Sequence, residues 1–286
     1  MNRSLKPLAL LPLLLIISTQ AFPRTVLKMN HQLPPEAVGS QLDQWFADQV
    51  FRETKREVKI EIYWSNALGE PSENLILLKN NAIDMAAMSP GYFPDKLPLH
   101  SAPNSIPMGM ENVCQSSRIM KALMENIPEF RQEASQNGIR ALFFHPLNPY
   151  LLITKEPVTR FEDLKGLRIR TWGKDMPLLI KAAGARSVNL FLPDLYDALK
   201  HGVIDGCPFS TDLMVSYRIY ELAKHVTEVV LWEGPGWGVW ISEQSWHKLT
   251  PEHQQILLSV AEQTRQREVK ETLKADKRSE EHTSEL

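Results

Sequence analysis

From residue 27 onward, the chain alternates between apolar residues at helical spacing and short runs with the two-residue period of a strand. Residues 37–54 predict a helix with one apolar face, made by Leu42, Trp45, Phe46 and Val50. A strand over 58–64, a helix from Pro71 through Leu78 and a buried strand over 83–88 follow. Together these segments predict a β-α-β unit.

The same alternation continues to the end of the chain. It predicts helices over 113–124, 130–137, 175–183, 193–200 and 212–223, and strands over 139–144, 167–172, 187–191, 203–206, 226–232 and 238–241. A final helix begins with Thr250 as its N-cap and Pro251 at its first position. Because strands and helices alternate, the fold class that we expect is α/β, with sheets covered by helices.

Two segments repeat one motif. LKNNAID at residues 78–84 and LKHGVID at 199–205 share leucine, lysine, isoleucine and aspartate at identical spacing, each between a predicted helix and a predicted strand. Two lobes of similar build would produce this repeat, and chance similarity is the competing explanation.

Length and charge bound the class of protein. The 286 residues carry 32 lysine and arginine against 34 aspartate and glutamate residues, a net charge of -2. No broad basic surface is therefore available for nucleic acid or anionic lipid. The length suffices for one large domain or two modest ones.

Residues 1–21 have the pattern of a signal peptide. Arg3 and Lys6 precede an apolar run over 8–17, and Ala21 closes a stretch of short side chains suited to cleavage. The run is shorter than the roughly 20 apolar residues of a spanning helix. We therefore expect a periplasmic protein, where Cys114 and Cys207 either pair or remain small buried side chains.

The other end of the chain also differs from the rest. Residues 278–286 lack the apolar spacing of the helix before them. We interpret them as a non-native tail, with an ordinary solvated tail as the alternative. Neither interpretation gives them a function.

Enzyme motifs are absent from the sequence. It has no GxSxG, no Walker A, no GxGxxG after a strand, no HExxH and no CxxC. The eight histidines are scattered, so solvated or structural roles outweigh metal ligation. We expect no catalytic residues, no metal and no cofactor.

Recognition chemistry is concentrated in the predicted strand over 167–172. Alternation sends Arg168, Arg170 and Trp172 to one face of this strand. Arg170 lies at the carboxyl end, the edge at which open α/β sheets present their ligand crevice. Its planar fork of donors suits a carboxylate, and a surface salt bridge is the alternative role.

Aromatic residues gather in two further places. The run LWEGPGWGVW at 231–240 can form a strand that crosses between lobes beside an aromatic wall, or its tryptophans can anchor the core. Ser89 and Tyr92 follow a predicted strand directly. They place a hydroxyl and an aromatic ring at a strand end, unless they form an ordinary turn.

Several motifs, in this order, carry a family resemblance: FEDLKGLRIR at 161–170, AAGA at 182–185, LYDALKHGVIDG at 195–206 and WISEQSWHKLTPE at 240–252. With them, the stretch over 161–249 resembles the solute-binding proteins of TRAP transporters, the tripartite ATP-independent periplasmic systems. Weaker similarity covers the rest of the mature chain, including NALGE at 66–70 and NNAIDMAAMSPGYFP at 80–94.

The resemblance implies two α/β lobes that are joined by crossing strands and a long helix and close over a ligand. Lobe I would hold residues 22–147, with 235–265 returning to it or bridging, and lobe II residues 148–234. The helix over 250–277 would bridge them. The implied partners are a small carboxylate and the membrane permease subunits of a TRAP transporter, with the receptor itself a monomer.

The resemblance also implies which residues bind. The arginine of the DLKGxxxR stretch, Arg170 here, would pair with the carboxylate of the substrate. Further pocket positions map to Ser89, Tyr92, Glu70, His31 and Gln32.

The chain departs from the family pattern at two places. Tyr150 stands where sialate-type relatives carry a second arginine, and the segment 207–210, with Phe209, stands where many relatives have a glutamate and an asparagine. Together with Trp172 and Trp237, these changes favour an apolar or aromatic acid over a sugar acid or a dicarboxylate.

The resulting prediction is a periplasmic solute receptor that binds a small organic carboxylate in a cleft between lobes and delivers it to the permease. A ligand-sensing receptor for a membrane signalling protein would share the same binding apparatus. A secreted hydrolase is the remaining alternative, and the missing catalytic motifs count against it.

Overall fold

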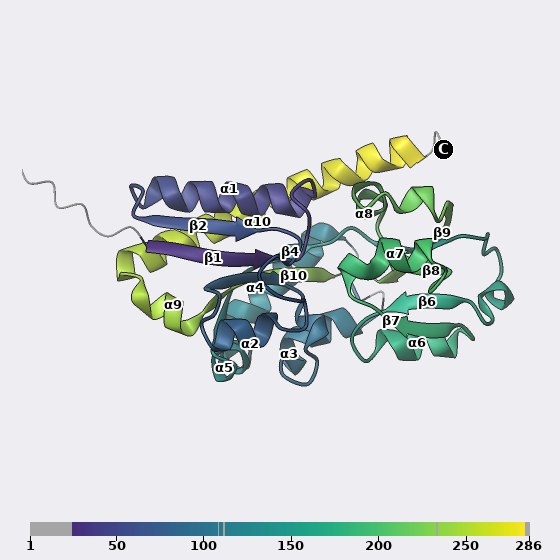
Figure 1. Ribbon diagram of the computed structural model, residues 1–286, viewed down its shortest axis with the longest axis horizontal. Helices are drawn as coiled ribbons and strands as arrows, with labels where there is room; N and C mark the ends of the chain where they lie inside the picture. The colour runs from purple at the N-terminus through teal and green to yellow at the C-terminus, as the bar shows by residue number, and fades with distance from the viewer. Residues whose placement is uncertain (1–24, 108, 111, 233, 284–286) are drawn as a thin grey trace, which may run out of the picture.

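The computed structural model describes residues 25–283, except 108, 111 and 233, so the predicted signal peptide lies outside the described residues. Two five-stranded mixed sheets form the two halves of the molecule (Figure 1). The halves around the first and second sheets are named lobe I and lobe II. This arrangement of two helix-covered sheets confirms the predicted α/β, two-lobed fold class.

The sheet of lobe I has the order β2-β1-β3-β10-β4. β1 is parallel to β2 and β3, whereas β10 is antiparallel to both of its neighbours, β3 and β4. The strands of this sheet are β1 Thr25–His31, β2 Val58–Tyr63, β3 Met85–Met88, β4 Ile139–Pro146 and β10 Pro235–Ser242.

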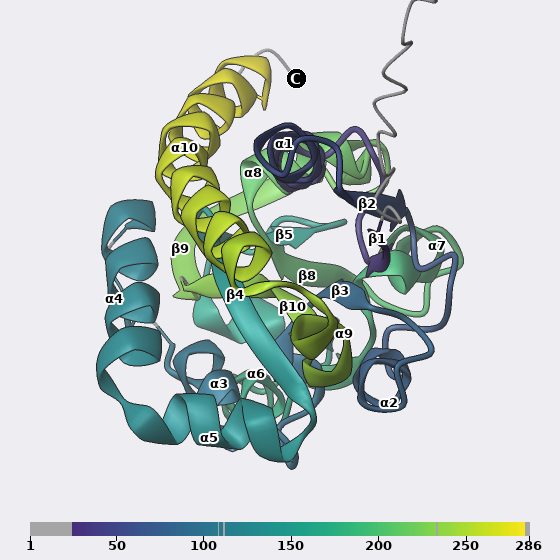
Figure 2. The same ribbon diagram turned by 90° about the vertical axis from the view of Figure 1, so that its left-hand side faces the viewer.

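Helices cover both faces of this sheet, with α1 and α10 on one face and α2 and α5 on the other (Figure 2). In β3, Met85 and Ala87 join the first buried cluster, and Ala86 and Met88 join the second, because successive strand side chains point to opposite faces. The helices of lobe I are α1 Val38–Glu53, α2 Asn74–Lys79, α3 Pro98–Ser101, α4 Val113–Asn126, α5 Pro128–Gln136 and α9 Glu243–Lys248.

The sheet of lobe II repeats this pattern, with the order β7-β6-β8-β5-β9. β6 is parallel to β7 and β8, and β5 is antiparallel to β8 and β9. Its strands are β5 Tyr150–Thr154, β6 Arg168–Thr171, β7 Arg186–Asn189, β8 Gly206–Phe209 and β9 His225–Trp232, and its helices are α6 Met176–Ala182, α7 Leu195–Lys200 and α8 Thr211–Ser216.

The repeated sequence motif has the same structural role in both lobes. The carboxylate of Asp84 accepts a hydrogen bond of 2.9 Å from the backbone N–H of Lys28 in β1. The carboxylate of Asp205 accepts one of 2.8 Å from the backbone N–H of Arg168 in β6. Each aspartate thus joins the turn between a helix and the next strand to the backbone of the adjacent parallel strand, as expected for two lobes of similar build.

The chain crosses from one lobe to the other twice, once in the segment from β4 to β5 and once in the segment from β9 to β10. Helix α10, Pro251–Thr283, packs on α1 and β4 of lobe I and on α8 of lobe II (Figure 1). Its start is as predicted, since the Thr250 hydroxyl accepts a 3.1 Å hydrogen bond from the backbone N–H of His253. The helix continues beyond residue 277, the expected limit, while the non-native origin of the tail stays a prediction.

Two predicted elements of lobe II were wrong. Residues 203–205 are not in a strand, because the turn after α7 occupies them and β8 begins only at Gly206. The helix expected over 212–223 ends early, because Arg218 adopts a left-handed backbone with φ of 56°. A short 3-10 helix, Ile219–Glu221, follows.

Candidate functional site

Arg170 lies in the interior of the molecule, at the lobe junction. It is the third residue of β6 and its exposure is only 3%. The guanidinium Nε donates a 3.3 Å hydrogen bond to the carbonyl of Leu190, and its Cζ lies 4.8 Å from the centre of the Trp172 ring. Strand alternation predicted that this guanidinium and this indole would share a face.

The two arginines of β6 differ in their partners. Arg168 pairs with Asp205, with 2.6 Å between Nη2 and Oδ1. By contrast, none of the ion pairs among the described residues includes Arg170. The surface salt bridge that we considered as the alternative for Arg170 therefore belongs to its neighbour, and the buried guanidinium has no carboxylate partner from the described part of the chain.

Tyr92 brings lobe I to this arginine. It ends the 3-10 helix Pro90–Tyr92 after β3. Its hydroxyl lies beside the charge of Arg170 and accepts a 3.3 Å hydrogen bond from the backbone N–H of Leu192, and its ring lies edge-on to that of Phe191, with 4.9 Å between ring centres. Burial raises the pKa of Tyr92 against the opposing charge of Arg170, so the hydroxyl stays protonated.

Aromatic rings form the rest of the wall. Tyr150 lies edge-on to Trp172, with 5.7 Å between ring centres, and to Trp232, with 5.0 Å. Burial raises the pKa of the Tyr150 hydroxyl and raises that of the Cys207 thiol to about 12, so both stay neutral. These uncharged side chains surround the buried guanidinium of Arg170.

A small cavity of about 30 Å³ lies among these side chains. Its lining includes seven of the ten predicted binding residues: Gln32, Ser89, Tyr92, Tyr150, Arg170, Trp172 and Trp237. The remaining lining residues are Leu147, Leu192, Leu213, Trp232 and Gly236. Of these, Trp232 and Gly236 belong to the tryptophan-glycine run noted in the sequence, whereas the three leucines gave no sequence signal that separates them from core residues.

Three predicted binding residues do not line this cavity. Glu70 is exposed at the surface. Phe209 is fully buried in β8 behind Tyr150, at 5.8 Å between ring centres. His31 is fully buried and bonds to Asp43, with 2.8 Å between Nε2 and Oδ2. The structure thus places none of these three against the free space beside Arg170.

His31 belongs to a buried chain of four ionisable side chains behind the cavity. Asp43 of α1 lies between His31 and His145, with 3.1 Å between its Oδ1 and Nε2 of His145. His145 also pairs with Glu268 of α10 and stacks on Trp237 at 4.4 Å between ring centres. This network therefore supports the Trp237 wall from behind and ties α10 to lobe I.

The pKa values of the network follow from its pairings. Burial alone would lower the pKa of His145, but Asp43 and Glu268 together raise it to about 10. Burial alone would raise the pKa of Asp43, but the charge of His145 and bonds from both histidines lower it below its ordinary value. At neutral pH, His145 is therefore an imidazolium between carboxyl groups.

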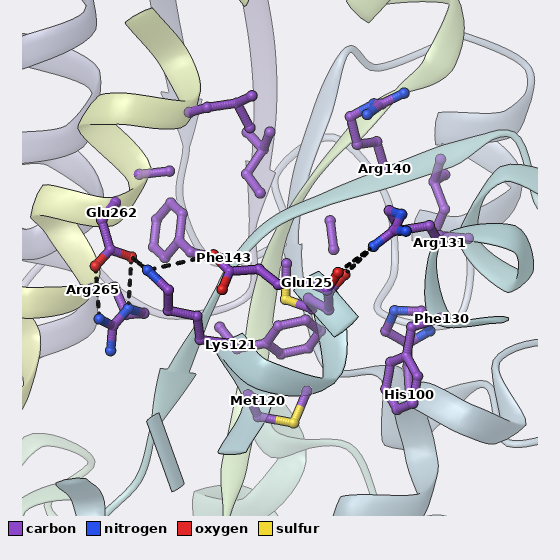
Figure 3. Close-up of a pocket in the computed structure, with 18 of the residues that line it drawn as sticks. His100, Met120, Lys121, Glu125, Phe130, Arg131, Arg140, Phe143, Glu262 and Arg265 are labelled. Atoms are coloured by element: carbon purple, nitrogen blue, oxygen red, sulfur yellow. Dashed lines mark hydrogen bonds and ion pairs between the residues drawn. The ribbon is translucent and has the colours of Figure 1, made fainter. Parts of the chain in front are cut away.

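A much larger hollow, of about 1090 Å³, lies on the outer side of lobe I between α4, α5, β4 and α10 (Figure 3). Its charged groups are engaged by neighbouring side chains or, for Arg131, by backbone carbonyls. Lys121 and Arg265 both pair with Glu262, at 3.0 and 2.8 Å, and Arg140 pairs with Glu243 at 3.2 Å. It contains none of the predicted binding residues, so its size alone does not make it the ligand site.

Cys114 and Cys207, whose pairing the sequence left open, are not bonded to each other. Within the described residues, no group of histidine, cysteine, aspartate and glutamate side chains is arranged to hold a metal ion. No helix in the same part of the chain has the length and apolar character to span a membrane.

Two similar lobes that meet over a buried cavity define the class of two-lobed binding proteins, in which the lobes close by a hinge motion. A family model narrows this class. Residues 29–285 match the bacterial extracellular solute-binding proteins, family 7. The chain belongs to this family.

Curated relatives are distant. A solute-binding protein of Albidiferax ferrireducens is 26% identical over 72% of this chain, and the match spans 62% of that protein's own length. The uncharacterized protein YiiZ of Salmonella typhimurium is 24% identical over 87% of the chain and 76% of its own length. The ectoine-binding periplasmic protein TeaA of Halomonas elongata is 26% identical, over 71% and 60%.

Solved structures share the fold. A TRAP periplasmic solute-binding protein of Xanthobacter autotrophicus, with bound β-D-galacturonate, has a TM-score of 0.82 at 20% identity and covers 91% of this chain and 86% of its own. An extracytoplasmic solute receptor of Bordetella pertussis that binds pyroglutamic acid has a TM-score of 0.84 at 20% identity, over 91% and 85%.

Proposed function

We propose that this chain is the periplasmic receptor of a TRAP-type secondary transporter, which binds a small organic carboxylate between its lobes and delivers it to the membrane permease subunits. Its family membership and its structural likeness to TRAP solute-binding proteins support this function. The signal-peptide pattern over residues 1–21 supports the location. As a receptor, the chain would release its ligand chemically unaltered.

The observation that carries the proposal is the buried guanidinium of Arg170, which has no carboxylate partner among the described residues. An unpaired buried charge costs several kcal/mol, and an anion that enters the cavity would offset that cost. The planar donors of arginine bind both oxygens of a carboxylate. Each such charge-assisted hydrogen bond contributes roughly 1.5 to 3 kcal/mol.

The test is a calorimetric titration of the protein and its Arg170→Met variant with a panel of organic acids. Loss of two charge-assisted bonds should weaken binding by about a hundredfold or more. Arg186→Met is the matched control, because Arg186 is exposed on the neighbouring strand β7 and should leave affinity unchanged. Equal affinities of the Arg170→Met variant and the unaltered protein would refute the assignment.

Two further measurements separate the receptor from its alternatives. Mass spectrometry of an organic acid that also carries an ester or amide bond should recover it unaltered after prolonged incubation with the protein, whereas a hydrolase would cleave that bond. Reconstituted permease subunits in vesicles should take up that acid only when this protein is present. Uptake that does not depend on the protein would favour a sensory receptor.

A further inference from the structure

The cavity beside Arg170 offers hydrogen bonds that a simple carboxylate would not use. Three of its lining residues have a buried polar atom without a partner in the described part of the chain: Oε1 of Gln32, Nε1 of Trp232 and Nε1 of Trp237. All three side chains are more than nine-tenths buried. Polar atoms buried in this way are normally satisfied, so each of these needs an explanation.

The chemistry of the three atoms specifies what would satisfy them. An indole N–H only donates, so each tryptophan requires an acceptor. The free carbonyl oxygen of Gln32 requires a donor. A hydroxyl or an amide group both donates and accepts, whereas an alkyl or aryl chain does neither. A second negative charge would suit the indoles but not the carbonyl of Gln32.

These groups are divided between the lobes. Arg170 and Trp232 belong to strands of lobe II, whereas Trp237 is in β10 of lobe I and Gln32 directly follows β1 of lobe I. A ligand with its carboxylate on Arg170 and a second polar group on Gln32 and Trp237 would therefore bond to both lobes at once. Among the described residues that line the cavity, Arg170 is the single charged one, which favours one carboxylate over two.

We propose that the ligand is a short monocarboxylate that carries one hydroxyl or amide group near the carboxylate, and that Gln32, Trp232 and Trp237 recognise this second group. The inference rests on the proposed function and specifies its substrate class. It narrows the apolar or aromatic acid favoured by the sequence to one with a second polar group. The free space of about 30 Å³ is close to the volume of one water molecule, so the ligand can enter only when the lobes separate, and a short ligand requires the smallest rearrangement.

Matched pairs of acids test the second group. The pairs are lactate with propionate, pyroglutamate with cyclopentanecarboxylate, and mandelate with phenylacetate, with succinate and glucuronate as the dicarboxylate and sugar-acid controls. In at least one pair, the member with the polar group should bind about tenfold or more tightly than its partner and more tightly than both controls. Ratios near one in every pair, or tightest binding of succinate or glucuronate, would overturn the inference.

Variants distinguish this result from the role of Arg170. Gln32→Met and Trp237→Phe should reduce the ratio within the discriminating pair towards one, and they should retain binding of the simple acid. Arg170→Met should remove binding of both members. Trp246→Phe is the control, because Trp246 is buried in α9 of lobe I, is not among the cavity-lining residues, and should leave the ratio unchanged.

The outcomes separate the two proposals. If acids bind through Arg170 with no advantage for the polar member, the substrate class fails and the receptor function stands. If no acid binds to a protein whose thermal unfolding shows that it is folded, both fail. An unchanged ratio in folded Gln32→Met and Trp237→Phe variants would also overturn the role of these residues.

Discussion

Arg170 places a permanent charge where the protein itself provides little to balance it. The guanidinium donates a hydrogen bond to one carbonyl oxygen, the Tyr92 hydroxyl lies beside it, and Trp172 covers its face. None of these groups carries a negative charge. A side chain in this position favours ligand binding at the expense of the stability of the folded protein.

Arg170→Met should therefore stabilise the ligand-free protein. Methionine has a similar length and needs no counter-charge, so we expect a gain on the order of 1 kcal/mol in the free energy of unfolding and a higher Tm. Thermal unfolding followed by circular dichroism measures it. The exposed Arg186→Met control should change stability by less than about 0.5 kcal/mol. A lower Tm for Arg170→Met would show that its hydrogen bonds outweigh the buried charge.

At this scale, the sequence predicted the direction of side chains better than their burial. Alternation in β6 correctly placed Arg170 beside Trp172. It could not place Phe209, because β8 is buried on both faces and either face accepts an aromatic ring. It could not place His31 either, because its partner Asp43 comes from α1, and only the packing of that helix on the sheet brings the pair together.

Four elements meet in the buried network of His31, Asp43, His145 and Glu268, which come from β1, α1, β4 and α10. Removing one member would leave a buried charge on the others without its partner, which is strongly destabilising. The network therefore makes the position of α10, which contacts both lobes, dependent on the protonation of one imidazole.

This network should make stability fall at alkaline pH. His145 has a pKa of about 10 in the folded protein against 6.5 for the free side chain. Below pH 6.5 His145 is protonated in both the folded and the unfolded protein, and its contribution to stability is complete. As the pH rises towards 10, the unfolded chain has lost the proton that the folded protein keeps, so the free energy of unfolding decreases.

Chemical unfolding at a series of pH values between 6.5 and 10 measures this decrease. His145→Gln should be less stable at the lower pH and should lose most of the slope. The lowered pKa of Asp43 acts in the opposite direction, because its contribution is lost only as the pH falls below the ordinary carboxyl range. Parallel curves for the variant and the unaltered protein would contradict the role of His145.

The sequence predicted elements well where their ends carry a chemical signal. Thr250 and Pro251 marked the start of α10, and Gly138 and Gly184, both with positive φ, follow α5 and α6. The prediction failed where the limits of an element depend on contacts with distant parts of the chain. A strand was predicted to begin at residue 203, but residues 203–205 form the turn that brings Asp205 to the start of β6.

At the scale of the whole molecule, the lobes touch closely at one pair of glycines. Gly173 follows β6 in lobe II and has a φ of 61°. A Cβ atom at this residue would lie 3.2 Å from the carbonyl oxygen of Gly91 in lobe I. The backbones of the two lobes therefore approach each other at a point where any larger residue would interfere.

Gly173→Ala should weaken ligand affinity by hindering closure. The left-handed backbone costs alanine about 1 kcal/mol in any arrangement of the lobes, but the contact with Gly91 occurs only when they are together. We expect a dissociation constant several-fold higher by calorimetry. Gly166→Ala is the matched control, since its φ is 82° and no atom lies within 4 Å of its Cβ position. An equal loss of affinity in both variants would rule out a specific effect on closure.

The tight enclosure of Arg170 has a consequence for kinetics. A solute cannot diffuse to the guanidinium while Tyr92 and Phe191 hold the two halves together. The solute can bind only after the two lobes separate spontaneously. The rate of that separation is a property of the protein and does not depend on the solute. At high solute concentration the observed rate of binding would then reach a plateau, and the plateau value would equal the rate at which the lobes separate.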